Sequence, residues 1–137
     1  MLGVKKIVAR LPVEDLDRAR GWYAEKLGLT PEETRPGGAR YVIGSCEFAL
    51  FVSAGKSDGS FTQLGFEVAD LRAAVSHLRS RGVVFEEYSD GRLRTEECIA
   101  TIQGNYPSKG SGEFAAWFRD SEGNMLGLAQ PFQAAIR

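Results

Sequence analysis

The sequence contains very little of the two residue types that build most metal and disulfide sites. Among 137 residues there are two cysteines, Cys46 and Cys98, and one histidine, His77. The cysteines are far apart and form neither a Cys-x-x-Cys pair nor a disulfide framework, so we expect reduced, structural thiols. His77 has no second histidine or carboxylate at ligand spacing, so we expect it to be solvated rather than bound to a metal.

The sequence also lacks an excess of charge of one sign. Seventeen Lys and Arg balance eighteen Asp and Glu, which gives a formal net charge of -1. Proteins that bind the phosphate backbone of nucleic acids, or an anionic membrane surface, usually carry a basic excess. We therefore expect neither nucleic acid nor a membrane as a partner.

Long apolar runs are absent as well. No stretch approaches the ~18 apolar residues of a membrane span, and residues 1–6 have no apolar segment behind their charges. We therefore expect a cytoplasmic protein. The hydrophobic fraction of 43% and the charged fraction of 26% are typical of globular proteins, and the length suits one folding unit. The sequence predicts a single domain over residues 1–137.

The chain repeats itself at an offset of 55 residues. In each copy a strand-like segment leads to an Asp that can cap a helix, then to the helix, and then to a glycine that ends it. The matched residues are Val13 with Val68, Asp15 with Asp70, Leu16 with Leu71, Ala19 with Ala74 and, after a one-residue slip, Gly28 with Gly82. We infer a first module at about residues 4–54, a polar linker at 55–60, and a second module at about 61–131.

Hydrophobic periodicity places the elements of each module. Apolar spacing predicts helices over residues 15–27 and 70–81. Strands are predicted at 40–43, 48–53, 83–87, 114–119 and 125–130. The Asp, Gly and Asn within residues 120–124 predict a tight turn that joins the last two strands into a hairpin. Residues 88–113 show no clear element beyond a short amphipathic piece at 95–102.

Three segments resemble a known family. They are Val13-Glu14-Asp15-Leu16-Asp17-Arg18-Ala19 with the following Trp22-Tyr23 and Leu27-Gly28-Leu29, then Phe66-Glu67-Val68-Ala69-Asp70-Leu71, and then residues 117–128. The pattern resembles the vicinal oxygen chelate (VOC) superfamily, which includes glyoxalase I, extradiol dioxygenases and bleomycin-binding resistance proteins. The resemblance implies an α+β fold in which two repeated βαβββ modules form curved sheets around a cavity.

The resemblance also implies a divalent metal in the enzyme members, held by His, Gln or Glu side chains. The implied ligand positions fall on Val8, Gln63 and Gly127. Val8 has no donor atom, Gly127 has no side chain, and the amide oxygen of Gln63 could coordinate a hard cation only weakly. Because a tight site needs about three protein ligands, we expect no metal and no cofactor. Metal-dependent glyoxalase or dioxygenase chemistry is disfavoured.

Strand alternation predicts which side chains face the cavity. The candidate ligand-binding residues are Val8, Arg10, Phe51, Gln63, Glu67, Trp117 and Gly127. No catalytic residue is indicated. An apolar pocket with aromatic walls and one or two polar groups suits a drug-sized or planar ligand. The alternative is that these aromatic side chains only fill the core.

Our leading hypothesis is a metal-independent, small-molecule-binding protein that sequesters an antibiotic or a metabolite, with Arg10 available to an anionic or polar group. Two alternatives stay open. One is a lyase, isomerase or dioxygenase of the same superfamily with a relocated metal site. The other is a non-catalytic interaction module that acts as a dimer. Members of the family commonly pair, so we expect a homodimer.

Overall fold

The computed structural model describes residues 2–133, which form two compact units. Unit 1 contains the residues up to 60 together with 120–124, and unit 2 contains 61–119 and the residues from 125 onward. Each unit has one sheet and one α-helix, and the sheets have four and five strands. The predicted α+β fold with two repeated modules is confirmed. No helix within residues 2–133 is long and apolar enough to span a lipid bilayer.

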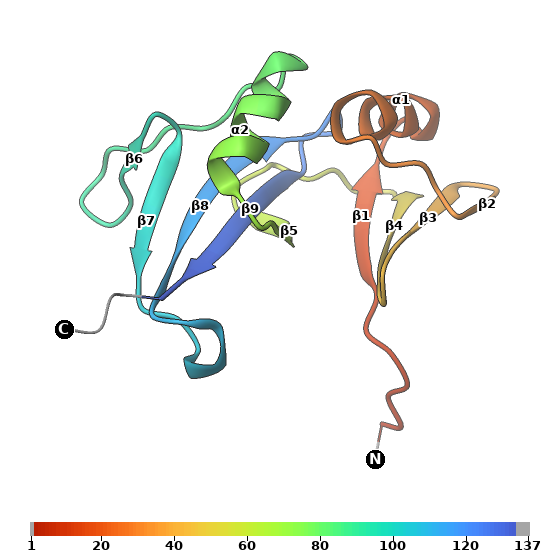
Figure 1. Ribbon diagram of the computed structural model, residues 1–137. Helices are drawn as coiled ribbons and strands as arrows, with labels where there is room; N and C mark the ends of the chain where they lie inside the picture. The colour runs from red at the N-terminus through yellow and green to blue at the C-terminus, as the bar shows by residue number, and fades with distance from the viewer. Residues whose placement is uncertain (1, 134–137) are drawn as a thin grey trace. The chain divides into compact units, whose positions relative to one another are not determined.

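Unit 1 follows the order strand, helix, three strands (Figure 1). Its elements are β1 Ala9–Val13, α1 Leu16–Trp22, the π-helical turn η1 Tyr23–Leu27, β2 Glu33–Arg35, β3 Gly38–Ile43 and β4 Cys46–Val52. The strand order across the sheet is β1-β4-β3-β2. β1 and β4 are parallel, and the other pairs are antiparallel.

The first predicted helix is confirmed, including both of its ends. The Asp15 side chain accepts a hydrogen bond from the Arg18 backbone N–H at 3.0 Å, which caps the helix. Gly28 ends the helical segment in the left-handed conformation with φ 68°, which glycine adopts without strain. Between these ends, Ala19 and Tyr23 are buried, and the Tyr23 ring packs 6.0 Å from the Phe48 ring of β4.

Unit 2 repeats the same arrangement with one additional short strand (Figure 1). Its elements are β5 Thr62–Glu67, α2 Leu71–Ser80, β6 Thr95–Glu96, β7 Ile99–Gln103, the 3-10 turn η2 Pro107–Lys109, β8 Gly112–Arg119 and β9 Met125–Phe132. The strand order is β5-β9-β8-β7-β6, and β5 pairs with β9 in parallel. Asp70 caps α2 as predicted, by accepting a hydrogen bond from the Ala73 backbone N–H at 3.0 Å.

One predicted strand is wrong, and the short amphipathic segment at residues 95–102, whose type was not predicted, forms two strands. Residues 83–87 do not form a strand, because only Phe85 makes a bridge, to Phe118 near the end of β8. Buried Val83 and Phe85 alternate with exposed Val84, as in a strand. The segment nevertheless lacks the continuous backbone pairing that defines one. Residues 95–102 form a hairpin of β6 and β7, with Glu97 and Cys98 at positive φ in its two-residue turn. Such turns usually carry Asn or Gly, so residue type did not predict this one.

The turn between β8 and β9 holds a buried carboxylate in unit 1. Glu122 is 3% exposed and accepts hydrogen bonds from the backbone N–H groups of Glu14 and Asp15, at 2.9 and 3.0 Å. The Arg18 guanidinium donates two more, at 2.8 and 3.0 Å. Burial opposes ionisation of Glu122, but the hydrogen bonds from Arg18, the Asp15 backbone, Ser121 and the Glu14 backbone outweigh it and lower its pKa to about 2.

Asp120 makes a second buried contact from the same turn. It accepts a hydrogen bond from the Tyr23 hydroxyl at 2.7 Å and others from the backbone N–H groups of Glu122 and Asn124. Burial, followed by the charge and hydrogen bond of Asp120, raises the pKa of Tyr23. The Tyr23 hydroxyl therefore stays protonated and acts as the donor.

We predict that Glu122→Gln lowers the free energy of unfolding by about 2 kcal/mol at pH 7, because charged hydrogen bonds to Arg18 and to two backbone groups are lost. Urea denaturation measures the change. Glu32→Gln, at an exposed carboxylate of the same unit, is the matched control and should have almost no effect.

The effect of Glu122→Gln should also depend on pH. The folded-state pKa of Glu122 is lowered from 4.5 to about 2, so its contribution is present above pH 4.5 and is lost as the pH falls through about 2. The difference in stability between the wild type and the variant should therefore shrink over this range. A difference that stays constant down to pH 2 would contradict the ionised role of Glu122.

Candidate ligand-binding pocket

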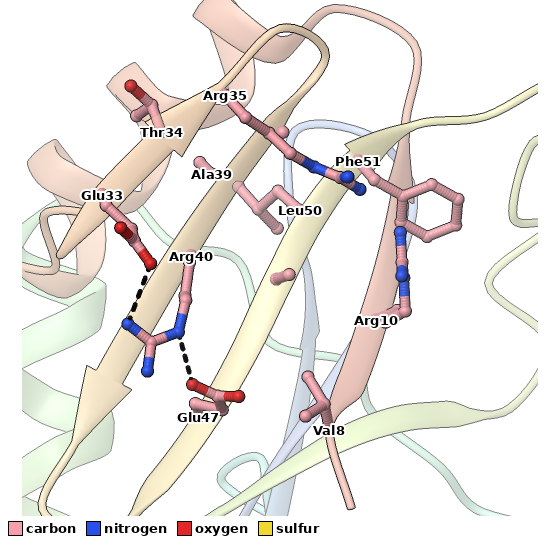
Figure 2. Close-up of a pocket in the computed structure, with 12 residues that line it drawn as sticks. Val8, Arg10, Glu33, Thr34, Arg35, Ala39, Arg40, Glu47, Leu50 and Phe51 are labelled. Carbon is pink, nitrogen blue, oxygen red and sulfur yellow. Dashed lines mark hydrogen bonds and ion pairs between the residues drawn. The ribbon is translucent and has the colours of Figure 1, made fainter.

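A pocket of about 450 Å³ lies on the sheet of unit 1, and all of its lining residues belong to this unit (Figure 2). Side chains alternate along β4, so that Glu47, Ala49 and Phe51 share one face of the strand. Phe48 and Leu50 share the other face, where Phe48 packs against Tyr23 and Tyr41. The sheet therefore carries the aromatic core of the unit on one face and the pocket on the other.

Strand register brings four lining residues into one row across the sheet. Arg10 of β1 lies opposite Ala49 of β4, Ala49 lies opposite Arg40 of β3, and Arg40 lies opposite Glu33 of β2. Neighbouring side chains on one face of a sheet are close enough to interact directly. The row places two arginines around a small, apolar alanine.

The next row contains Phe51, Gly38 and Arg35, again on consecutive strands. A Cβ atom added to Gly38 would lie 3.0 Å from Arg35 Nε and 3.1 Å from Arg35 Cγ. The missing side chain at position 38 thus lets Arg35 lie across β3. Figure 2 shows Arg35 reaching over this strand toward Phe51.

The two carboxylates of the pocket are neutralised by cations. Glu47 is paired with Lys6 at 2.8 Å and with Arg40 at 2.6 Å, and Arg40 also pairs with Glu33 at 3.3 Å. The hydrogen bond from Lys6 lowers the pKa of Glu47; burial works against it, and the hydrogen bond and charge of Arg40 add to the lowering. Glu47 is therefore an ionised partner of two cations and is unsuited to act as a general base.

Arg10 and Arg35 are the cations of the pocket that these carboxylates do not neutralise. Within residues 2–133, neither arginine forms an ion pair. The Arg10 guanidinium lies over the Phe51 ring, with its central carbon 4.6 Å from the ring centroid. Both side chains are exposed, so they can meet a ligand without prior rearrangement of an ion pair.

The sequence-predicted residues divide between the two units. Val8, Arg10 and Phe51 line the pocket of unit 1. Sequence reasoning missed four charged lining residues, Glu33, Arg35, Arg40 and Glu47. Alternation within the predicted strand at residues 40–43 could have suggested Arg40. β2 was not predicted, so nothing in the sequence pointed to Glu33 or Arg35.

The other four candidates lie in unit 2, and their role in ligand binding stays a prediction. Trp117 of β8 is opposite Gly127 of β9, and a Cβ atom at position 127 would lie 3.5 Å from the indole. Tyr88 packs edge-on against Trp117 at 5.5 Å. Gln63 lies at a register shift of β5, and Glu67 on the same strand pairs with Lys109 at 3.5 Å.

The three family positions do not fit a metal ion. Val8 presents an isopropyl group, and a side chain at position 127 would meet Thr62 Cγ2 at 3.3 Å and the Trp117 indole at 3.5 Å. The amide of Gln63 remains as one neutral donor, which is too few for a tight divalent site. Residues 2–133 also contain no group of three His, Cys, Asp or Glu side chains that could hold a metal ion.

Two repeated βαβββ units, with a pocket on the sheet of one of them, define a VOC-type small-molecule-binding fold. A sequence profile of the Glyoxalase/Bleomycin resistance protein/Dioxygenase superfamily matches residues 5–128. The chain belongs to this superfamily. A comparison with curated proteins gave no match.

Several solved structures share the fold. TnmS3, an antibiotic binding protein from Streptomyces sp. CB03234, has a TM-score of 0.64 and 21% identity over 96% of this chain and 100% of its own. A bleomycin-binding protein complexed with bleomycin has a TM-score of 0.63 and 22% identity over 94% of this chain and 100% of its own. A superfamily member from Alicyclobacillus acidocaldarius has a TM-score of 0.67 and 15% identity over 93% of this chain and 91% of its own.

We predict that Lys6→Met and Arg40→Met each raise the pKa of Glu47 toward its usual value, because each removes a cation that stabilises the carboxylate. Titration of the Glu47 carboxyl carbon by NMR measures the shift. Lys5→Met, at the exposed neighbour of Lys6, should leave the pKa unchanged. If neither Lys6→Met nor Arg40→Met moved the pKa, the paired arrangement in the pocket would be wrong.

Proposed function

We propose that this protein binds an organic small molecule in the pocket of unit 1, and that it works by sequestering this molecule without the help of a metal ion. The observation that carries the proposal is the pocket itself, about 450 Å³ in volume, with an apolar floor inside a frame of charged side chains. Ligand pockets commonly have a volume of a few hundred Å³ and combine an apolar surface with a few placed polar groups.

The chemistry of the pocket favours binding over catalysis. Its carboxylates, Glu33 and Glu47, are paired with cations, and no histidine or cysteine lines it. General acid–base catalysis needs a group whose pKa lies near the working pH, and the pKa of Glu47 is moved away from that range. These observations support a site that recognises a ligand and leaves it unchanged.

The structural neighbours support the same class of function. TnmS3 is described as an antibiotic binding protein, and another neighbour was solved with bound bleomycin. The similarity covers 100% of each of those two chains, so the whole fold of each is shared with this chain. We extend to this chain the class of function, sequestration of an antibiotic or metabolite, and not the particular ligand.

Metal independence, a cytoplasmic location and homodimerisation are also proposals. The misfit of Val8, Gln63 and Gly127 with a metal supports a metal-independent site. A cytoplasmic location and a homodimer remain predictions from the sequence and from the family. The enzyme with a relocated metal site and the dimeric interaction module gain no support from a particular contact in either unit.

We predict that Ala49→Trp weakens ligand binding at least tenfold, because an indole at the centre of the pocket floor fills the volume that a ligand needs. A panel of aromatic antibiotics is screened by isothermal titration, and native mass spectrometry tests the purified protein for a retained molecule. Ala73→Trp, on the exposed surface of α2, adds the same side chain outside the pocket and should bind normally. Equal binding by both folded variants would contradict the proposed site.

We also predict that protein purified without a histidine tag contains far less than one divalent metal ion per chain. Elemental analysis of the purified protein measures the metal content, before and after incubation with Zn²⁺, Ni²⁺ or Mn²⁺ and desalting. A stoichiometric metal that survives desalting would contradict metal independence and would support an enzyme with a relocated site.

A further inference from the structure

We propose that the pocket selects a planar aromatic ligand that carries a negative charge, with Arg10 and Arg35 binding the anionic group and Phe51 packing against the ring system. The proposal rests on the function proposed above and names the chemical class of the ligand. It follows from the positive charge of the pocket, from the contact between Arg10 and Phe51, and from the small side chain at the pocket floor.

The charge of the pocket is positive once its own ion pairs are counted. The lining cations are Arg10, Arg35 and Arg40, and the lining carboxylates are Glu33 and Glu47. Lys6 does not line the pocket, but it pairs with Glu47 and is counted with it. Two cations therefore remain after each carboxylate is matched with one. Arg40 and Lys6 are held by the carboxylates, so the unmatched charge belongs to Arg10 and Arg35. A cationic ligand would be repelled here, and an anionic one attracted.

Arg10 is placed for anion binding by its contact with Phe51. The guanidinium lies 4.6 Å from the ring centroid, a cation–π contact that favours this position of the long side chain. A guanidinium that stacks on an aromatic ring still presents N–H groups at its edge, and these match the two oxygens of a carboxylate. Because Arg10 favours this position without a ligand, less entropy is lost on binding.

Arg35 approaches the same aromatic side chain on the same face, from the other edge of the sheet. It starts on β2, crosses β3 where Gly38 leaves room, and points toward Phe51 on β4 (Figure 2). Arg10 comes from β1, which pairs with the other edge of β4. The two guanidinium groups thus reach toward Phe51 from two different strands. A residue larger than glycine at position 38 would displace Arg35.

The surface between the arginines suits a flat ligand. Ala49 projects little from the sheet, Phe51 supplies an aromatic surface in the next row, and the Arg35 side chain covers Gly38 in that same row. An aromatic ring can lie on such a floor and contact Phe51 while its anionic group reaches a guanidinium. A bulky, non-planar ligand of the same charge would meet the frame of ion-paired side chains around Arg40 instead.

The test compares three probes with the same ring system and different charge: 2-naphthoate, 2-naphthamide and 2-naphthylmethylammonium. We expect isothermal titration to show that naphthoate binds at least tenfold more tightly than the neutral amide, and that the cation binds most weakly. Raising NaCl from about 50 to 500 mM should weaken naphthoate binding and leave naphthamide binding unchanged, because salt screens exposed charges.

Variants identify the groups responsible. Arg10→Met and Arg35→Met should each weaken naphthoate binding about fivefold, which is the effect of losing one exposed ion pair, and leave naphthamide binding unchanged. Arg35→Lys should recover part of the loss. Arg92→Met, at an exposed arginine of unit 2, is the matched control and should bind naphthoate like the wild type. Urea denaturation confirms that each variant is folded.

The outcomes separate this inference from the proposed function. If naphthoate and naphthamide bind equally and Ala49→Trp blocks both, the pocket binds ligands but does not select an anion, and the inference fails alone. If Arg10→Met and Arg35→Met leave naphthoate binding intact, the inference also fails. If no probe binds while another ligand is lost in Ala49→Trp, the class of ligand is wrong. If no ligand of any kind depends on Ala49, both proposals fail.

Discussion

Glu122 joins two distant parts of the chain in unit 1, and the position of α1 depends on it. Its carboxylate reaches from the turn after β8 to the backbone N–H groups of Glu14 and Asp15, just before the helix begins. A helix start leaves such donors without partners and favours negative charge nearby. Arg18, one turn into α1, keeps the buried carboxylate ionised. Because burying an unpaired charge is costly, these groups must assemble together.

The fixed position of α1 determines which face of the sheet remains open. Tyr23, in the turn after α1, packs against Phe48 and donates to Asp120, so the helix covers the face that carries Phe48 and Leu50. The alternating residues Glu47, Ala49 and Phe51 are left on the opposite face. On that face Arg40 forms ion pairs with Glu33 and Glu47. Among the described residues, Arg10 and Arg35 have no carboxylate partner there, and they make the pocket basic. Buried acid groups on one side of the unit and exposed basic groups on the other thus have separate roles.

Most of the fold could be predicted from the sequence because its signals are local. Asp15 and Asp70 cap their helices as expected, and the spacing of apolar residues located both helices and most strands. The failures have a shared cause. Residues 83–87 have a strand-like pattern, but only Phe85 bridges to β8. The β6–β7 turn uses Glu97 and Cys98 in a conformation usually adopted by Asn or Gly. Neither the availability of a pairing partner nor an unusual turn is visible in local periodicity.

The sequence by itself determined the repeated module, the family resemblance and the absence of donor atoms at Val8 and Gly127, because these depend only on residue type and spacing. Only the tertiary structure decided which charges meet. Arg40 pairs with Glu47 and Glu33 because two antiparallel registers align three strands, and Arg35 reaches toward Phe51 because Gly38 lies between them. Strand register is set by contacts across the whole sheet, so the chemistry of the pocket follows from long-range pairing that no local sequence pattern specifies.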